Sequence, residues 1–484
     1  MLLRVSDVVR LSRPACAADS LSPSSRGCSE PPMPAGAPLT FLPPRLDRRV
    51  LWACRRSLPL WLRRSARIDR VEVEGQELLA AALERFRSGR SRLLLAFRHP
   101  SIDDPGPMAR LLWSQRPAAH AQFLYDRGIP LWAGEAIGWL LPRLGGCSIQ
   151  RGKLDLPALR TARELLLDGP YPFAAAPEGA TNGHNEMVSA LEPGVAQLAF
   201  WTADDLAKAG RAEATEVLPI GLQYTYRGSI WPAIEEVLAQ LERDAGLSPD
   251  PARSLDPESL YGRLIALAER MLGLLERFYR EAYRRDLPEL PPFQDGDDRA
   301  RIGERLPRLL DAALTVVEQP LGMEARGDLV ERCRRIEQAS WERLYPPTNG
   351  QAERCSLERG LADRLAEETA RRLWHMRMVE AFTAVSGHYV RESPSQERFA
   401  DTLLLLWDTQ CRILGSDPGQ RPRLGRRRAR VRIGEPIAVQ ERLPAYRADR
   451  RAAVAALTAD LQTTLQGLIV PSLQLAGPDA SRAW

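Results

Sequence analysis

A histidine and an aspartate five residues apart are the side chains best suited to chemistry in this sequence. They are His99 and Asp104, in the stretch FRHPSIDD at 97–104, and the whole chain holds only five histidines in 484 residues. The apolar run at 93–97 predicts a short buried strand, which would deliver His99 to its carboxyl end, where α/β proteins place reactive groups. A histidine beside a carboxylate can act as a general base on a hydroxyl group.

The same residues also have the pattern of a helix start. Ser101 and Asp104 have the spacing of a capping box, and Asp104 precedes Pro105, a favourable first residue of a helix. On this interpretation, Asp104 only begins a helix that runs through 108–113. Both interpretations stay open on these residues alone.

Three further clusters follow along the chain. The first runs from Gly145 to Arg151, where a glycine turn feeds a strand ending in a guanidinium that can hold a phosphate or remain an exposed charge. The second is the turn at Glu178 and Gly179, whose carboxylate can accept hydrogen bonds from a substrate hydroxyl or from loop amides, or can belong to an ordinary exposed turn. The third is a strand interrupted by Pro219, which indicates an edge strand or a bulge.

The clusters need a scaffold in which strands alternate with helices. Strand patterns lie at 70–75, 93–97, 121–125, 146–150, 172–176 and 217–226. Helical patterns lie between them at 76–87, 129–141, 155–168 and 193–209. This alternation predicts an α/β fold with a mixed sheet flanked by helices.

The organisation of the chain changes after the last of these strands. Long helical patterns such as 260–285 and 361–383 dominate, and strand-and-turn residues return near 430–437, followed by a helix at 445–468. We therefore expect a large all-helical insertion before the last strand. The expected divisions are a disordered N-terminus at 1–40, a basic amphipathic segment at 41–69, a core at 70–231, the insertion at 232–428, the last strand and helix of the core at 429–472, and a tail at 473–484.

The order and spacing of the four clusters resemble the glycerolipid acyltransferase family, which includes the 1-acylglycerol-3-phosphate O-acyltransferases. The resemblance rests on His-x4-Asp at 99–104, Gly-x5-Arg at 145–151, Pro-Glu-Gly at 177–179 and Val-x-Pro-Ile at 217–220. It covers about 70–228 and resumes at 431–437. It implies transfer of a fatty acyl group from acyl-CoA or acyl carrier protein to the hydroxyl of a lysophospholipid, with no metal or other cofactor.

The resemblance also implies a role for each matching residue. His99 would be the general base and Asp104 its orienting carboxylate, while Arg151 would hold the phosphate of the acceptor. Glu178 and Gly179 would line the acceptor pocket. The remaining matching positions, which the resemblance also places on the substrate side, are Ser101 and Pro219.

Two departures from the family pattern concern the acceptor. Ala180-Thr181-Asn182 stands where the family usually has Thr-Arg-Ser, so an arginine expected near the phosphate is missing. The insertion at 232–428 has no counterpart in the small members. The alternatives to 1-acylglycerol 3-phosphate are glycerol 3-phosphate, another hydroxyl lipid, or a lipid-binding homologue without catalysis.

Composition narrows the setting of the protein. Its 27% charged and 44% apolar residues are typical of a globular protein, and its seven scattered cysteines form no C-x-x-C pair. Reduced cysteines indicate a cytoplasmic compartment, and no apolar run reaches the roughly 18 to 20 residues needed to span a bilayer. We expect a peripheral protein on the inner face of a membrane.

Two arginine-rich segments bear on partners. Residues 45–70 hold nine arginines and two aspartates among Trp and Leu, which predicts a helix lying on a membrane surface or packed on the core of the protein. The arginine run at 421–432 indicates a solvated linker or contact with lipid head groups, and without interleaved aromatics it predicts no nucleic-acid partner. His184, close after the Glu178 turn, has no neighbouring histidine or cysteine with which to bind a metal.

Overall fold

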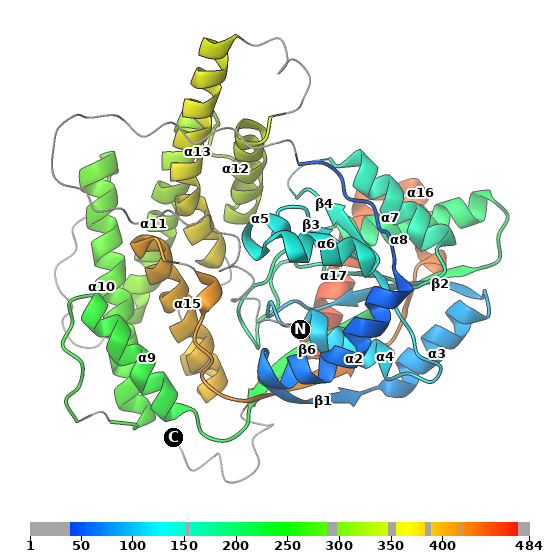
Figure 1. Ribbon diagram of the computed structural model, residues 1–484, viewed down its shortest axis with the longest axis horizontal. Helices are drawn as coiled ribbons and strands as arrows, with labels where there is room; N and C mark the ends of the chain where they lie inside the picture. The colour runs from blue at the N-terminus through cyan, green and yellow to red at the C-terminus, as the bar shows by residue number, and fades with distance from the viewer. Residues whose placement is uncertain are drawn as a thin grey trace.

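The computed structural model describes residues 39–151, 154–252, 254–287, 298–346, 355–382, 389–416 and 418–472. Except for Leu39 and Thr40, the N-terminal segment expected to be disordered lies outside these ranges, as does the expected tail at 473–484. The predicted α/β fold, a mixed sheet flanked by helices with a helical insertion, is confirmed (Figure 1).

Eight strands form one sheet. They are β1 (Ile68–Glu74), β2 (Ser91–Phe97), β3 (Gln122–Asp126), β4 (Gly146–Ile149), β5 (Phe173–Ala175), β6 (Ala214–Tyr226), β7 (Arg427–Ile433) and β8 (Ile437–Ala438). Their order is β1-β7-β6-β2-β5-β3-β4, with β8 also paired to β6. The neighbours run parallel except that β7 and β8 are antiparallel to β6.

Strand β2 lies in the middle of this sheet and separates two hydrophobic cores. Leu93 and Leu95 pack into the core on one face, whereas Leu94 and Ala96 pack into the core on the other. This division follows from the alternation of side chains along a strand. All four residues are fully buried, as the apolar run predicted. Position 99 therefore follows a rigid strand and emerges at its carboxyl end.

Helices cover both faces of the sheet. The first core includes residues of α2 (Arg48–Arg64), α3 (Gln76–Arg87) and α4 (Pro105–Trp113), and the second includes residues of α7 (Leu156–Asp168), α8 (Gly194–Lys208), α16 (Leu443–Ala448) and α17 (Arg450–Gly467). The helix expected at 129–141 is two pieces, α5 (Ile129–Ala133) and α6 (Glu135–Arg143). Gly134 separates them with φ of 90°, a backbone conformation that helical residues do not adopt.

Helix α2 packs against the first hydrophobic core of the protein. It continues as one helix through Pro59. Asp47 caps its start by accepting hydrogen bonds from the backbone N–H groups of Arg49 and Val50. Leu58 and Leu62 are buried in the first core, so the helix packs on the protein.

All secondary-structure elements in the described residues of the insertion between β6 and β7 are helices. It contains α9 (Trp231–Asp244), α10 (Pro257–Tyr283), α11 (Asp298–Leu321), α12 (Leu329–Leu344), α13 (Ser356–Phe382), α14 (Tyr389–Glu392) and α15 (Gln396–Leu414). It has two hydrophobic cores of its own. One is formed by α9, α10 and α15, and the other by α10, α11, α12 and α13. In Figure 1 these helices stand beside the sheet, with α12 nearer to α5 and β4 than α10 is.

Of the two alternatives for Pro219, an edge strand or a bulge, the structure excludes the edge strand. Strand β6 is central, paired with β2 on one side and with β7 and β8 on the other. The carbonyl of Pro219 faces the β7–β8 side, where it accepts a hydrogen bond of 2.9 Å from the backbone N–H of Gly434. This is the point at which the partner of β6 passes from β8 to β7, so the missing N–H of proline removes no ladder bond.

Within the described residues, no helix is both long enough and apolar enough to cross a membrane.

Candidate active site

His99 and Asp104 form a hydrogen-bonded pair at the carboxyl end of β2. Nδ1 of His99 lies 2.8 Å from Oδ2 of Asp104, and the aspartate side chain is 0% exposed while that of His99 is 24% exposed. Because an ionised carboxylate only accepts hydrogen bonds, Nδ1 carries the hydrogen and Nε2 keeps its lone pair. The ring therefore presents a basic nitrogen away from the aspartate.

Asp104 stands at the residue before α4 but does not act as a helix cap. Its side chain accepts no hydrogen bond from the first turn of that helix. Instead, Oδ2 accepts the backbone N–H of Ser101 at 2.9 Å, and Oδ1 accepts the hydroxyl of Tyr224 at 2.5 Å. The contact with Ser101 is half of the predicted capping box, and the same oxygen also contacts Nδ1 of His99.

Tyr224, on β6, is held in its donor form. Burial raises the pKa of its hydroxyl well above the ordinary value, and the charge of Asp104 raises it further. The guanidinium of Arg427 lies over the tyrosine ring, 4.7 Å from its centroid. Three elements, β2, β6 and β7, thus fix the position of one carboxylate.

Arginines of the run at 421–432 form ion pairs within the protein. Arg423 and Arg427 form ion pairs with the buried carboxylate of Asp103, and Arg421 pairs with Asp408 at 2.9 Å. Burial alone would raise the pKa of Asp103, but the two arginines outweigh it and lower that pKa. The run therefore ties β7 to the loop that carries the dyad.

Glu178 holds the backbone beside His99. The carboxylate, in a residue only 5% exposed, accepts hydrogen bonds from the backbone N–H of His99 at 2.7 Å and of Ser189 at 3.0 Å. The side-chain amide of Asn182 donates another at 2.8 Å. Of the two roles open to this carboxylate, the structure shows the one with loop amides.

Gly179 forms a close approach that only glycine permits. Its φ is +69°, and a Cβ placed on it would lie 2.2 Å from Oε1 of Glu192. Its carbonyl accepts a hydrogen bond from Nη1 of Arg151 at 3.0 Å. The Pro-Glu-Gly turn therefore connects the dyad to the residues around Arg151.

Thr181 occupies the open side of the histidine. Its Oγ1 lies 3.0 Å from Nε2 of His99. With the hydrogen of the ring on Nδ1, Nε2 accepts and the threonine hydroxyl donates. A hydroxyl thus already sits where a general base would meet the hydroxyl of a substrate.

Arg98 anchors the loop after Glu178 from beneath. It is fully buried, and its guanidinium donates to the carbonyls of His184, Asn185 and Met187 and to that of Leu222 on β6 at 3.0 Å. Sequence reasoning passed over this residue, because an arginine at a strand end is usually exposed and nothing local indicates burial.

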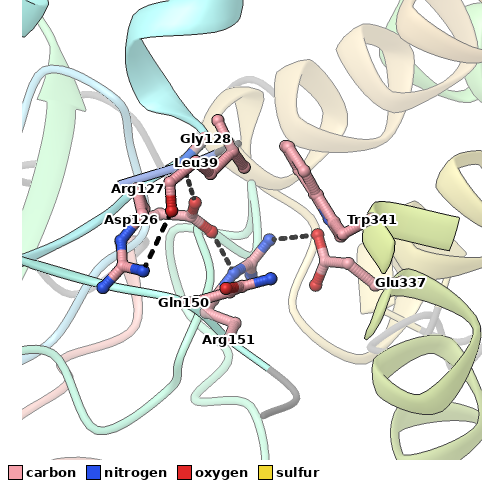
Figure 2. A pocket seen from close by; sticks show the side chains of 8 residues that line it. All are labelled: Leu39, Asp126, Arg127, Gly128, Gln150, Arg151, Glu337 and Trp341. Carbon is pink, nitrogen blue, oxygen red and sulfur yellow. Dashed lines mark hydrogen bonds and ion pairs between the residues drawn. The ribbon is translucent and has the colours of Figure 1, made fainter. Parts of the chain in front are cut away.

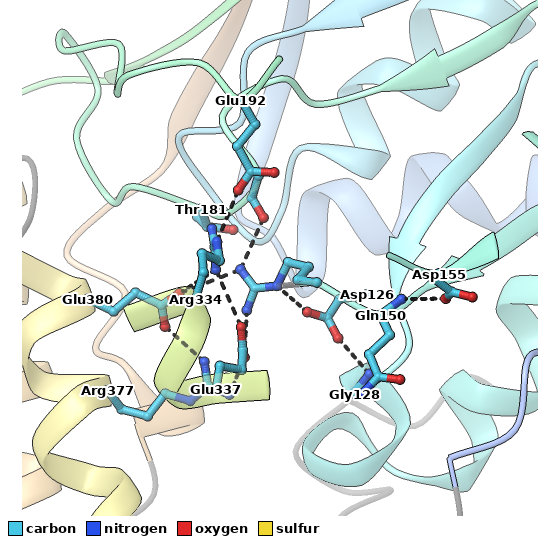
Figure 3. Close-up of polar contacts among 12 residues, drawn as sticks. Asp126, Gly128, Gln150, Asp155, Thr181, Glu192, Arg334, Glu337, Arg377 and Glu380 are labelled. Atoms are coloured by element: carbon cyan, nitrogen blue, oxygen red, sulfur yellow. Dashed lines mark hydrogen bonds and ion pairs between the residues drawn. The ribbon is translucent and has the colours of Figure 1, made fainter. Parts of the chain in front are cut away.

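Arg151 lies under the helical insertion and is surrounded by carboxylates. Its Nε donates to Asp126, its Nη2 lies 3.2 Å from Oε1 of Glu337, and its Nη1 lies 3.5 Å from Oε1 of Glu380. Figure 3 shows Glu337 and Glu380 pointing towards this network from α12 and α13. The guanidinium assigned to a phosphate by resemblance is bound here by three acidic side chains.

Two hollows lie near Arg151. A cavity of about 10 Å³, roughly the space of one water molecule, is lined by Asp126, Gln150, Glu337 and Trp341 among others (Figure 2). A larger open groove of about 630 Å³ lies between the start of α8 and the start of α12. It includes Glu192, the residue in contact with Gly179.

His184 is structural. It is 2% exposed, its Nδ1 lies 2.9 Å from the carbonyl of Asn182, and its ring packs edge-on against Tyr389. Burial lowers its pKa to about 4, so the ring is neutral. In the part of the chain that the structure describes, no three histidine, cysteine or acidic side chains are grouped to hold a metal ion.

The predicted site residues fall into two groups. The structure brings His99, Asp104, Ser101 and Glu178 into direct contact, and it places Gly179 and Arg151 beside them. Pro219 lies buried inside the sheet, where it is paired with Ala96 of β2. The loop of the dyad begins at Arg98, two residues after Ala96.

No protein-family model matches the chain, and neither does any curated protein.

Proposed function

We propose that the protein is an O-acyltransferase that moves a fatty acyl group from a thioester, acyl-CoA or acyl carrier protein, to the hydroxyl of a glycerolipid acceptor. The observation that carries the proposal is the dyad: a histidine anchored through Nδ1 on a buried aspartate, with Nε2 facing a hydroxyl at 3.0 Å. The motif resemblance supplies the acyl chemistry and makes 1-acylglycerol 3-phosphate one of the acceptors to be tested.

Each dyad residue has a defined part in the proposed reaction. Nε2 of His99 takes the proton as the acceptor oxygen attacks the thioester carbonyl, and Asp104 stabilises the imidazolium. The tetrahedral intermediate collapses with loss of the thiolate, which takes the proton from His99. The products are an ester and a free thiol. A thioester needs no metal activation, because thiolate is a good leaving group.

A peripheral membrane site accords with the surface of α2. Trp52 and Leu60 are 65% and 48% exposed, and the same outward side carries Arg48, Arg49, Arg55, Arg56, Arg63 and Arg64. The ring of Trp61 packs where a Cβ on Gly106 would stand, so α2 rests directly on the first turn of α4. This surface lies beside α4, the helix that follows Asp104, and we propose that it contacts the inner face of a membrane.

The test is acyl transfer by the purified full-length chain. The protein is incubated with labelled palmitoyl-CoA and a panel of hydroxyl acceptors, including 1-acylglycerol 3-phosphate, glycerol 3-phosphate and 1-acylglycerol. We expect a labelled ester with at least one of them and none with His99→Ala, whose thermal unfolding should match the wild type. Ester formation that survives His99→Ala would refute the role of the dyad.

A further inference from the structure

The insertion supplies most of the charges that surround Arg151. Arg334 and Glu337 come from α12, and Arg377 and Glu380 come from α13. Asp126 and Glu192 come from the sheet domain. The ion-paired network consists of three guanidinium groups and four carboxylates: Arg151, Arg334 and Arg377 with Asp126, Glu192, Glu337 and Glu380.

The two glutamates of the insertion are held on both sides. Glu337 lies 2.7 Å from Arg377 and 3.2 Å from Arg151, and its side chain is 3% exposed. Glu380 lies 3.0 Å from Arg334 and 2.9 Å from Arg377. Burial acts to raise the pKa of Glu380, but Arg151, Arg377 and Arg334 prevail and lower it to about 2. The carboxylate of Glu380 is therefore ionised beside Arg151.

Each nitrogen of Arg151 already has a partner within the protein in this arrangement. Nε is bound to Asp126, Nη2 to Glu337, and Nη1 to the carbonyl of Gly179 with Glu380 nearby. The carboxylates of Asp126, Glu337 and Glu380 lie around this guanidinium. A phosphomonoester dianion placed here would meet these negative groups in a partly buried site, where like charges interact strongly.

We propose that Glu337 and Glu380 are specificity-determining residues that exclude a phosphomonoester from the acceptor site, so that the acceptor is a hydroxyl lipid with an uncharged end beside Arg151. This inference rests on the proposed acyl transfer. It turns the insertion into the part of the protein that sets acceptor choice. Discrimination of this kind works by placing repulsive groups against the wrong ligand.

The turnover test compares two acceptors that differ only in the phosphate, 1-acylglycerol and 1-acylglycerol 3-phosphate, with palmitoyl-CoA as donor. We expect kcat/KM to favour 1-acylglycerol by about tenfold or more in the wild type. Glu337→Gln with Glu380→Gln removes two negative charges from beside Arg151 and should shift the ratio towards the phosphorylated acceptor by about tenfold or more. Equal use of both acceptors by the wild type, or preference for the phosphate, would overturn the inference.

Matched controls separate charge from fold. Glu342→Gln with Glu368→Gln removes two exposed carboxylates from the same two helices and should leave the ratio unchanged. If the double variant at 337 and 380 does not fold, Glu380→Gln alone tests the same shift, since that side chain is 22% exposed. An unshifted ratio in a folded variant counts against the proposed role of the glutamates.

A binding measurement decides the question without turnover. Equilibrium dialysis with labelled glycerol 3-phosphate should show no saturable binding to the wild type and measurable binding to the double variant, lost again when Arg151→Ala is added. Wild-type binding that Arg151→Ala removes would overturn the exclusion of phosphate. If no acceptor is acylated at all, the proposed acyl transfer fails, while this measurement still shows whether the glutamates repel a phosphate.

Discussion

The hydroxyl of Tyr224 donates a 2.5 Å hydrogen bond to Oδ1 of Asp104, on the carboxylate whose other oxygen meets His99. The tyrosine stands on β6, and the aspartate follows β2, the neighbouring strand. The bond therefore joins the dyad to the centre of the sheet. It makes Tyr224 a positioning residue, which acts on the base through Asp104.

Tyr224→Phe should weaken both the fold and the reaction. It leaves Oδ1 of a fully buried carboxylate without its hydroxyl partner, which costs about 1–3 kcal/mol of unfolding free energy. We expect kcat to fall several-fold, with a smaller change in KM, because the carboxylate is less well oriented. Urea denaturation and steady-state kinetics measure the two effects. Unchanged values of both would contradict the positioning role.

Asp104→Asn should cost much more activity than Tyr224→Phe. An asparagine amide can donate to Nδ1, which moves the ring hydrogen to Nε2 and removes the lone pair that acts as base. We expect kcat/KM to fall by about a thousandfold or more. The matched control is Asp286→Asn, an exposed carboxylate, with no expected change. A loss of less than about tenfold would show that Asp104 does not set the tautomer.

Thr181→Val tests whether the hydroxyl at Nε2 is only a placeholder. Valine keeps the shape of threonine and removes the donor, so the base is left open to the acceptor hydroxyl. We expect kcat/KM within about threefold of the wild type, since a neutral hydrogen bond contributes little net energy. Loss of activity in the variant, together with an acyl adduct that intact-protein mass spectra show for the wild type but not for Thr181→Val, would instead establish a covalent intermediate.

The stability of the protein should depend on pH through Asp401, on α15. Burial raises its pKa from 3.8 to about 7, although the N–H of Asn185 and the hydroxyl of Tyr389 hydrogen-bond to it. Between these two values the folded protein keeps a proton that the unfolded chain has lost. The stability that protonated Asp401 contributes to the folded protein is therefore present at low pH and is lost as pH rises from 3.8 to about 7.

Asp401→Asn removes this titration. As pH rises from about 4 to about 7, the unfolding free energy of the variant should increase relative to that of the wild type. Above about pH 7 the difference between the two should be constant. Chemical denaturation at a series of pH values measures it, with Asp286→Asn as control. A difference that is constant with pH, or that shrinks as pH rises, would contradict the raised pKa of Asp401.

The sequence predicted the parts of the site that depend on local pattern. The apolar run before His99 and the spacing to Asp104 located the base and its partner, because a strand end and a tight turn determine their separation. Glu178 was expected at the sheet edge and is found beside His99 because β5 is the neighbour of β2. These are consequences of short-range geometry and parallel strand order.

The contacts that sequence reasoning missed join residues far apart in the chain. Tyr224 reaches Asp104 only through the pairing of β6 with β2, and nothing in the local sequence of Tyr224 indicates that contact. Arg151 was assigned to a phosphate, but Glu337 and Glu380 belong to helices whose placement over the sheet no local pattern reveals. Thr181 was noticed only as a departure from a motif, whereas its position depends on the turn at Gly179.

The path of the chain through the sheet has a consequence for synthesis. The second half of β6 pairs with β7, and the insertion separates these two strands in the chain. The insertion must therefore leave the ribosome before β7 can pair with β6. Until then, the second half of β6 has an open edge, which is prone to pair with other chains. Asp103 likewise has no ion pair with Arg423 or Arg427 until those residues have been synthesised. In a nascent chain, the contacts of the dyad loop would thus be complete only after nearly the whole chain has been synthesised. This order of synthesis favours folding of the insertion as a unit before the sheet is complete.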